Sequence, residues 1–386
     1  MLDTFLWLGE PVRFWGAVVF VFGCIVGSFL NVCIHRMPRE MGLMSPGSHC
    51  PKCGTAIPWY RNLPVVTWLW QRGRCAECSA RIPARYLLVE VLTGVAFLAA
   101  FLLVWLKFRT MDPFPAAAMT VGLCTLLAGL ITATFIDFEH YIIPDEITIG
   151  GMVVGVFFSL LAPELHETFS AKQELTRLAA GSQALLGLAV GAGVVYGMVR
   201  LGKALFGRQE FAFEEPARVV FTEHELHLPD EVIPYEDIFY RASDRVVFQA
   251  ERLELVDKCV WDQPVVVSAD VLKIGEQELD PETVLHMEVV TGRIVVPREA
   301  MGFGDVKFMG AIGAFLGWHA AVFTLMLSAV IGSVVGVGSM VLSRGEGPPR
   351  LPYGPYLALA AVVWMFGGYE WWHDWWSQFT ELEGKG

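Results

Sequence analysis

Residues 115–145 read PAAAMTVGLCTLLAGLITATFIDFEHYIIPD, an apolar run with an acidic end. No charged side chain occurs in 115–136, and about 20 apolar residues suffice for a helix to cross a bilayer core. The run ends at Asp137, and a second carboxylate, Asp145, follows a Tyr-Ile-Ile-Pro sequence. We therefore expect a membrane protein that carries a carboxylate at the end of one span.

The whole chain has the composition of a membrane protein. Of its 386 residues, 54% are hydrophobic and 18% are charged, whereas a soluble domain carries about 25% charged residues. The sequence therefore predicts an all-α polytopic membrane protein with about eight transmembrane helices. The predicted spans are 14–34, 86–106, 115–136, 146–162, 178–201, 304–317, 319–342 and 352–370.

Basic residues predict the orientation of these spans. Residues 35–85 contain eight Lys and Arg but only two acidic residues, and positive charge favours the cytoplasmic side. With eight spans, both termini would lie outside. The Trp-rich tail, with its pairs at 371–372 and 375–376, is typical of an interfacial aromatic belt and implies contact with membrane lipid.

The sequence divides into five predicted parts. Segment 207–300 contains 21 Asp and Glu against 9 Lys and Arg, which equals the net charge of the whole chain, −12. Its short β-branched runs between turn residues predict a β-rich cytoplasmic insert. No basic stripe for nucleic acid is present. The parts are a first transmembrane helix in 1–34, a cytoplasmic loop in 35–85, a four-helix membrane block in 86–206, the acidic insert in 207–300 and the C-terminal membrane helices in 301–386.

Asp305 is a second carboxylate at a predicted span end. It lies in Met-Gly-Phe-Gly-Asp-Val-Lys, and on this topology Asp137 and Asp305 both lie at the cytoplasmic ends of their spans. Two neighbouring carboxylates share a proton and can act together as acid and base in peptide hydrolysis. Gly302 and Gly304 would let the backbone approach another helix or an extended substrate.

A structural interpretation of these carboxylates stays open. An Asp at a span end is often a helix cap, and Asp305 would suit the N-cap of a helix that starts at Val306. Asp145, which follows Pro144 and precedes an apolar run, is typical of a helix start.

Four cysteines form two CxxC pairs, Cys50/Cys53 and Cys75/Cys78, with 21 residues between the pairs. This spacing is close to that of zinc ribbons. Disulfides or a redox pair are the alternative, but stable disulfides are rare in a cytoplasmic loop. We expect a zinc-ribbon-like loop with a structural zinc, because four thiolates leave no open coordination position.

Several of these motifs resemble those of bacterial prepilin peptidases. The sequence Gly-Phe-Gly-Asp-Val-Lys at 302–307 resembles their GxGD motif, and Asp137 followed by Ile-Ile-Pro-Asp at 142–145 resembles their other aspartate motif. Residues 27–38 and 85–94 resemble the N-terminal domain of the bifunctional branch. The resemblance covers about 1–205 and 296–370 but not the insert.

The resemblance implies an activity and its partners. It implies that Asp137 and Asp305 cleave the leaders of prepilins or pseudopilins, which are the subunits of type IV pili or type II secretion systems. The cleavage would take place at the cytoplasmic face of the bacterial inner membrane. Asp145 matches a family position, and Lys307 would orient the dyad or bind lipid phosphate. The bifunctional branch also methylates the new N-terminus with S-adenosylmethionine.

Asn31 and Glu90 are polar residues within apolar helices, where such groups are costly and often functional. One interpretation is that they bond each other or nearby backbone for structural reasons. The other places them in the methyltransferase pocket.

Two other functions are compatible with intramembrane carboxylates. One is an intramembrane protease of the presenilin or signal-peptide-peptidase type, against which the CxxC loop and the order of motifs count. The other is a transporter with a proton relay, for which carboxylates near mid-span are expected. The insert could be a spacer, a docking surface for a basic leader, or a lineage-specific fold with no role in catalysis.

Overall fold

The computed structural model describes residues 10–45, 47–107, 112–170, 175–229, 231–235, 238–239, 244–256, 258–297, 302–342 and 351–383. The chain forms two compact units, which are described separately. The helical unit comprises Met1–Val195 and Phe303–Gly386. The second unit, Tyr196–Gly302, contains the sheet.

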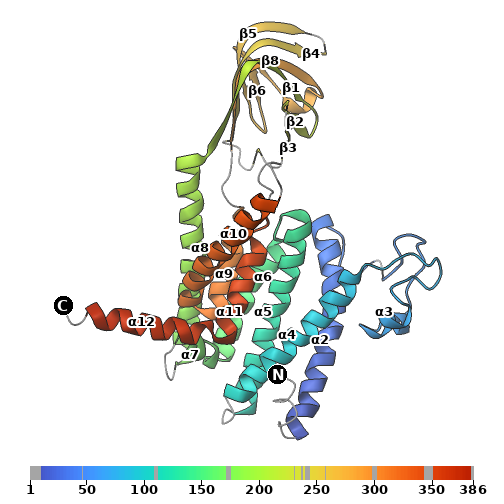
Figure 1. The fold of residues 1–386 in the computed structure, drawn as a ribbon, viewed down its shortest axis with the longest axis vertical. Helices are drawn as coiled ribbons and strands as arrows, with labels where there is room; N and C mark the ends of the chain where they lie inside the picture. Colours follow the sequence, from blue (N-terminus) through green and yellow to red (C-terminus); the bar gives the residue numbers. More distant parts are fainter. Residues whose placement is uncertain are drawn as a thin grey trace. The chain divides into compact units, whose positions relative to one another are not determined.

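The helical unit is a bundle of long helices with several short ones (Figure 1). Its helices are α2 Glu10–Arg36, α3 Val66–Trp70, α4 Ala84–Lys107, α5 Pro113–His140, α6 Asp145–Leu161, α7 Glu164–Ser170, α8 Arg177–Phe206, α9 Phe303–Leu316, α10 Trp318–Leu342, α11 Gly354–Val363 and α12 Tyr369–Glu383; the last part of α8 belongs to the second unit.

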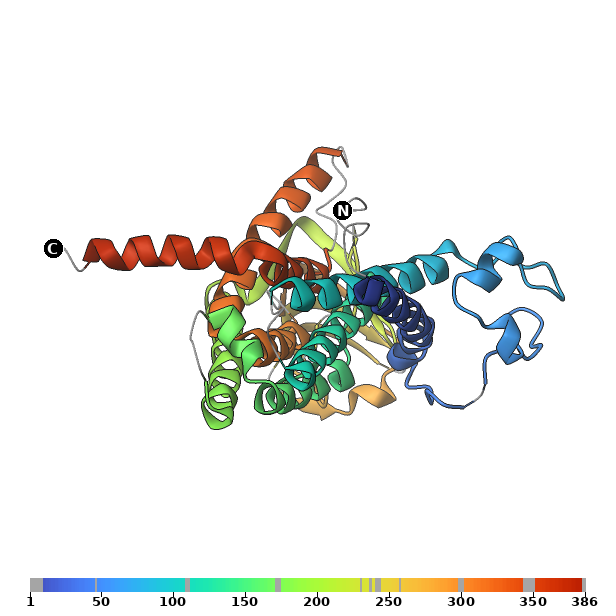
Figure 2. The same ribbon diagram turned by 90° about the horizontal axis from the view of Figure 1, so that it is seen from below.

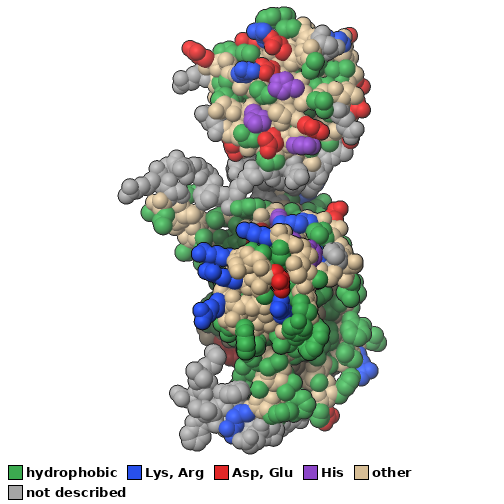
Figure 3. Space-filling view, turned by 90° about the vertical axis from the view of Figure 1, so that its right-hand side faces the viewer, with side chains coloured by type: hydrophobic (Ala, Val, Ile, Leu, Met, Phe, Trp, Pro, Cys, Tyr) green, Lys and Arg blue, Asp and Glu red, His purple; other side chains and the backbone are tan. Residues whose placement is uncertain are grey.

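Among the described residues, 5 helices are long and apolar enough to cross a membrane: α2, α4, α5, α8 and α10. The other three predicted spans coincide with shorter helices, since α6 has 17 residues, α9 has 14 and α11 has 10. Large apolar side chains on α2 and other helices are exposed, as expected for a lipid-facing surface. Figure 3 shows hydrophobic side chains over the lower part of this unit, with Lys and Arg gathered above them.

Two of the short helices, α9 and α11, are enclosed by protein. In α9, every residue from Asp305 to Leu316 is buried except Lys307. In α11, seven of the ten residues are buried. A helix that neighbouring helices surround does not need the full length of a lipid-exposed span.

The span predicted over 352–370 ends earlier than expected. After α11 the chain forms a π-turn, Trp364–Gly368, in which Gly367 has a φ of 133°. Only glycine adopts this conformation readily. Helix α12 then leaves the bundle crosswise in both views (Figures 1 and 2), and its Glu370 and Asp374 would be costly inside a bilayer.

Small residues allow the helices to approach closely. A Cβ added at Gly23 would lie 2.8 Å from the Cα of Gly94, which brings α2 against α4. A Cβ at Gly187 of α8 would lie 2.0 Å from the carbonyl oxygen of Gly313 in α9, and one at Gly191 would lie 2.4 Å from that of Met309. This spacing of glycines four apart is typical of packed membrane helices.

The second unit confirms the predicted β-rich insert. It is an 8-stranded antiparallel sheet with the order β3-β2-β1-β8-β4-β5-β6-β7. The Lys203 ammonium of α8 lies 2.7 Å from the buried Asp244 carboxylate and so joins the end of α8 to this unit. The strands are β1 Arg208–Phe221, β2 Glu225–His227, β3 Val232–Pro234, β4 Val246–Leu255, β5 Cys259–Val267, β6 Leu272–Ile274, β7 Gln277–Leu279 and β8 Met287–Pro297.

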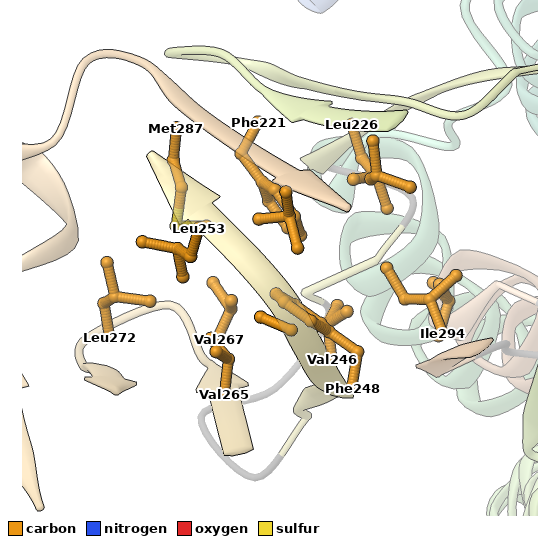
Figure 4. Close-up of a cluster of buried hydrophobic side chains, with 14 of the residues drawn as sticks. Phe221, Leu226, Val246, Phe248, Leu253, Val265, Val267, Leu272, Met287 and Ile294 are labelled. Carbon is orange, nitrogen blue, oxygen red and sulfur yellow. The ribbon is translucent and has the colours of Figure 1, made fainter. Parts of the chain in front are cut away.

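One face of this sheet forms a hydrophobic core. Phe221, Phe248 and Leu253 lie at its centre, and their strands alternate buried and exposed residues. Figure 4 shows these side chains converging from several strands. The insert therefore has a core of its own, as an independently folded domain requires.

Candidate active site

The first predicted catalytic residue, Asp137, lies in the last turn of α5 and is only 5% exposed. Its Oδ2 accepts a 2.8 Å hydrogen bond from the backbone N–H of Gly354. A Cβ at Gly354 would lie 2.8 Å from that same oxygen, so a larger residue here would displace the carboxylate. Gly354 begins α11, and the carboxylate therefore meets one of the free N–H groups at a helix start.

The second predicted catalytic residue, Asp305, lies in the first turn of α9 and is 8% exposed. Helix α9 begins at Phe303 rather than Val306, so Asp305 is inside the helix and the N-cap interpretation is wrong. Gly302 directly precedes the helix. A Cβ at Gly304 would lie 3.4 Å from Ile143, which is an ordinary contact, so helix packing does not demand glycine there.

The segment Tyr353–Gly354 interacts with both carboxylates. Gly354 bonds Asp137, while Tyr353 interacts electrostatically with Asp305. The Tyr353 hydroxyl also lies 3.0 Å from the Ser328 hydroxyl, which fixes the ring. Helix α11 contacts both α5 and α9, so the helices that carry these residues pack against one another.

Ion pairs fix which end of the helical unit carries the site. Arg85, at the start of α4, pairs with Glu139, two residues after Asp137. Because α4 begins where the loop 37–83 ends, the site lies at the end that carries this loop, called here the loop end. Lys307 of α9 pairs with Asp145 of α6, so α6 and α9 also begin at the loop end.

Asp145 has a structural position. It is the first residue of α6, after an N-cap at Pro144, as predicted for a helix start. Its partner Lys307 lies one turn before the middle of α9 and contacts the Phe303 ring. The pair links the starts of two helices and so positions the turn that carries Asp305.

The four predicted zinc ligands lie together. The Sγ atoms of Cys50, Cys53, Cys75 and Cys78 are all within 4.8 Å of one another, and those of Cys50 and Cys78 are 3.8 Å apart. A tetrahedral zinc with Zn–S bonds of about 2.3 Å needs sulfurs about 3.8 Å apart. The donor set therefore fits zinc.

The two CxxC segments have the same backbone conformation. The N–H of Cys50 bonds the carbonyl of Thr55, and that of Cys75 bonds the carbonyl of Ala80. Each turn closes with a second bond, from Gly54 to the carbonyl of Cys50 and from Ser79 to that of Cys75. This repeated turn presents all four thiols to one point.

Hydrogen bonds set the protonation of these thiols. The hydroxyl and N–H of Thr55 lower the pKa of Cys53 to about 6. Backbone N–H groups of Cys78 and Glu77 lower the pKa of Cys75. The N–H of Ala80 acts to lower the pKa of Cys78, but desolvation and the neighbouring sulfurs raise it to about 11. Four adjacent thiols thus cannot all ionise unless a cation joins them.

A cavity of about 440 Å³ lies between this loop and the ends of α2 and α4. Asn31 and Glu90, the residues predicted for a methyltransferase pocket, both line it. They do not bond each other: the Asn31 amide donates to the Gly27 and Tyr86 carbonyls, and Glu90 accepts from the N–H of Val65 at 2.7 Å. The volume suits a drug-sized ligand.

Two contributors to these sites were not predicted from the sequence. Tyr353 and Gly354 lie in Pro-Tyr-Gly-Pro at 352–355, whose turn-forming residues could have marked a helix start. Trp68 of α3 lines the cavity, with its ring packed against Gly73. Nothing in the local sequence distinguishes Trp68 from the neighbouring aromatic residues of the loop.

Comparison with known proteins agrees with this architecture. The model of the bacterial peptidase A24 N-terminal domain matches residues 21–104. The model of the type IV leader peptidase family matches residues 124–209 and 281–337, which leaves out most of the insert. No solved structure shows significant similarity to the chain.

Curated relatives carry the same family name. A prepilin leader peptidase/N-methyltransferase from Aeromonas salmonicida is 26% identical, over 90% of both chains. One from Myxococcus xanthus is 28% identical, over 86% of this chain and 65% of its own. One from Neisseria gonorrhoeae is 36% identical, over 36% of this chain and 54% of its own. The chain therefore belongs to the type IV leader peptidase family and is an enzyme of that aspartic peptidase class.

Proposed function

We propose that this chain cleaves prepilin or pseudopilin leaders and that Asp137 and Asp305 carry out the reaction. The main support is that both carboxylates are buried at the loop end and share the Tyr353–Gly354 segment as neighbour. The names of the curated relatives support the substrate class.

In the proposed reaction, one carboxylate takes a proton from water while the other gives a proton to the scissile carbonyl oxygen. The water oxygen attacks the carbonyl carbon, and the C–N bond then breaks as the amine is protonated. The Gly354 N–H occupies Oδ2 of Asp137 and leaves Oδ1 for the water. No side-chain nucleophile or covalent intermediate is needed.

The proposed orientation places this site at the cytoplasmic face of the bacterial inner membrane. The loop carries the excess of Lys and Arg, and the Arg85–Glu139 pair lies beside Asp137. Positive charge favours the cytoplasmic side. A single-span substrate with a basic leader would then bring its cleavage point to the depth of the dyad. In this proposal the shorter helices α6, α9 and α11 complete eight crossings.

The loop is proposed to hold one structural zinc through Cys50, Cys53, Cys75 and Cys78. When bound, the metal would supply a cross-link only, because four thiolates leave no open position. The loop has few buried side chains of its own, so such a cross-link would stabilise the wall of the cavity.

A second activity, N-methylation of the new N-terminus, is supported by the cavity. We propose that it binds S-adenosylmethionine, with Trp68 as an aromatic wall and Asn31 and Glu90 as polar groups. When bound, the cofactor would supply the methyl group. The relatives' names include this activity.

The test of the peptidase is cleavage of a purified prepilin in liposomes. Asp137→Asn and Asp305→Asn should each lower the rate by at least about 10³-fold, as expected for loss of a general acid or base. Glu139→Gln is the matched control, since this carboxylate is two residues away on the same helix and partly exposed. It should leave the rate within about twofold. Full cleavage by either Asp→Asn variant would remove that residue from the mechanism.

A further inference from the structure

The orientation of the Asn31 amide is fixed by its surroundings. Its Nδ2 lies 3.0 Å from the carbonyl oxygen of Tyr86 and 3.3 Å from that of Gly27. Both neighbours are acceptors, so only the NH₂ group can face them, and the flipped amide would oppose oxygen to oxygen. The side chain therefore directs Oδ1 elsewhere.

This Oδ1 has no partner among the described residues, although Asn31 is only 2% exposed. A buried acceptor without a donor costs about 1–3 kcal/mol. Because Asn31 lines the cavity, a bound group with N–H donors would remove this cost.

Glu90 adds a negative charge beside it. The Asn31 amide bonds the carbonyl of Tyr86, and Glu90 lies one turn further along α4. Helix α2 approaches α4 closely at this point, since a Cβ added at Gly27 would lie 2.7 Å from the Cα of Glu90. The Glu90 side chain is buried, accepts from the N–H of Val65 and bonds the hydroxyl of Ser28. Its bonds to the loop and to α2 hold the carboxylate against the cavity.

The two groups share one chemical preference. An amide oxygen and a carboxylate accept hydrogen bonds and cannot donate them. The ligand group that satisfies both carries several N–H donors and a positive charge. A primary ammonium has three donors and the matching charge.

We propose that Asn31 and Glu90 form a binding site for a primary amino group. This inference rests on the proposed methyltransferase function of the same cavity. The amino group comes either from the amino-acid part of the methyl donor or from the free N-terminus of the cleaved substrate. The two sources share one chemistry, and separate binding measurements distinguish them.

The first measurement compares two nucleosides, each titrated into the purified full-length protein in detergent and followed by calorimetry. S-adenosylhomocysteine has the amino group, and 5′-methylthioadenosine lacks it. If the donor's amine occupies the site, wild type should prefer S-adenosylhomocysteine by about tenfold or more, the value of one charge-assisted bond. Glu90→Gln should remove that preference and leave 5′-methylthioadenosine binding unchanged.

The second measurement compares two peptides with the sequence of a mature pilin N-terminus, one with a free amine and one N-acetylated. If the substrate's amine occupies the site, the free peptide should bind about tenfold tighter, and Glu90→Gln should abolish the difference. Asn31→Leu, which is similar in size, should reduce the same preference and tests the site independently if Glu90→Gln does not fold. Thr93→Val is the control, because Thr93 is buried one turn from Glu90 but does not line the cavity.

The outcomes separate the two proposals. The amino-group site would be overturned if both nucleosides and both peptides bind without any preference for the amine. It would also be overturned if a preference exists but survives in Glu90→Gln and Asn31→Leu. In either case the cavity remains a ligand site. Failure of both nucleosides to bind wild type would instead defeat the methyl-donor pocket. The peptide titration then still decides the amino-group site, and absence of peptide binding as well would overturn both.

Discussion

The backbone N–H of Gly354 donates a 2.8 Å hydrogen bond to Oδ2 of Asp137, across 217 residues of sequence. Gly354 is the first residue of α11, so the carboxylate of α5 binds the positive end of another helix. This bond holds Asp137 in one orientation and couples its position to α11. The orientation of the Asp137 carboxylate therefore depends on the start of α11 as well as on α5.

Gly354→Ala should damage the site without unfolding the protein. The added Cβ would lie 2.8 Å from Oδ2 of Asp137 and 3.1 Å from Ile143, so the carboxylate has to move. A displacement of about 1 Å can cost about 10²-fold in rate, and we expect a loss of prepilin cleavage of about that size. Thermal unfolding in detergent should change little.

Gly193→Ala is the control for that substitution. A Cβ at Gly193 meets no atom within 4 Å, and alanine favours helix more than glycine does. This variant should cleave at the wild-type rate. Equal rates for Gly354→Ala and Gly193→Ala would show that Asp137 does not depend on the Gly354 contact.

Helices α8 and α9 should separate when one glycine is replaced. A Cβ at Gly313 would lie 2.1 Å from the carbonyl oxygen of Gly187, and no side-chain rotation relieves a clash with backbone. Gly313→Ala should therefore lower stability by about 1–3 kcal/mol or more. Because α9 carries Asp305, cleavage should fall as well.

Differential scanning fluorimetry in detergent would measure the loss of stability in Gly313→Ala. The control is Gly338→Ala of α10, because a Cβ at Gly338 meets no atom within 4 Å. A melting temperature for Gly313→Ala equal to that of the control would contradict the close α8–α9 contact.

Zinc retention should depend on pH in a defined direction. The pKa of Cys53 is lowered to about 6, so its thiolate is favoured in the folded loop. A group with a depressed pKa contributes to stability above its unfolded pKa and loses that contribution as pH falls through the folded value. Protons also compete with zinc for the thiolates, so zinc should remain bound at neutral pH and be released as the pH falls.

Metal analysis of dialysed protein at a series of pH values would follow this release. Wild type should hold about one zinc per chain at pH 7.5, and Cys50→Ser and Cys75→Ser should hold much less. Cys259→Ser is the matched control, because Cys259 is an exposed thiol on strand β5. Equal zinc contents in Cys50→Ser and in this control would exclude the four-cysteine site.

Much of the architecture could be predicted from the sequence, because long apolar runs and paired cysteines have few physical solutions. The runs that became α2, α4, α5, α8 and α10 needed only length and hydropathy. The insert was predicted from its alternating β-branched strands, and its sheet confirms this. The cysteine spacing predicted a cluster, which the sulfur positions match.

Tertiary contacts were not predictable from local patterns. The length of α9 depends on enclosure by its neighbours, which hydropathy alone does not show. The contact between Gly354 and Asp137 joins residues far apart in sequence. Likewise, the orphan oxygen of Asn31 follows from the Tyr86 carbonyl on another helix, and a single sequence does not encode that pairing locally.

Helix α12 should lie along the membrane surface rather than across the membrane. The turn at Gly367 redirects the chain, and Lys107 at the end of α4 pairs with Glu370, which holds α12 at the end of the bundle opposite the loop end. Trp371 is 63% exposed and Trp375 is 42% exposed, and tryptophan prefers the interface between headgroups and acyl chains.

In liposomes, lipids brominated near the headgroup should quench the fluorescence of these two residues more than lipids brominated at the chain ends. The double variant Trp371→Phe/Trp375→Phe should lose that shallow component, whereas Trp261→Phe, in the insert, should keep it. Stronger quenching from the chain ends would mean that α12 enters the bilayer core, which would contradict its position at the membrane surface.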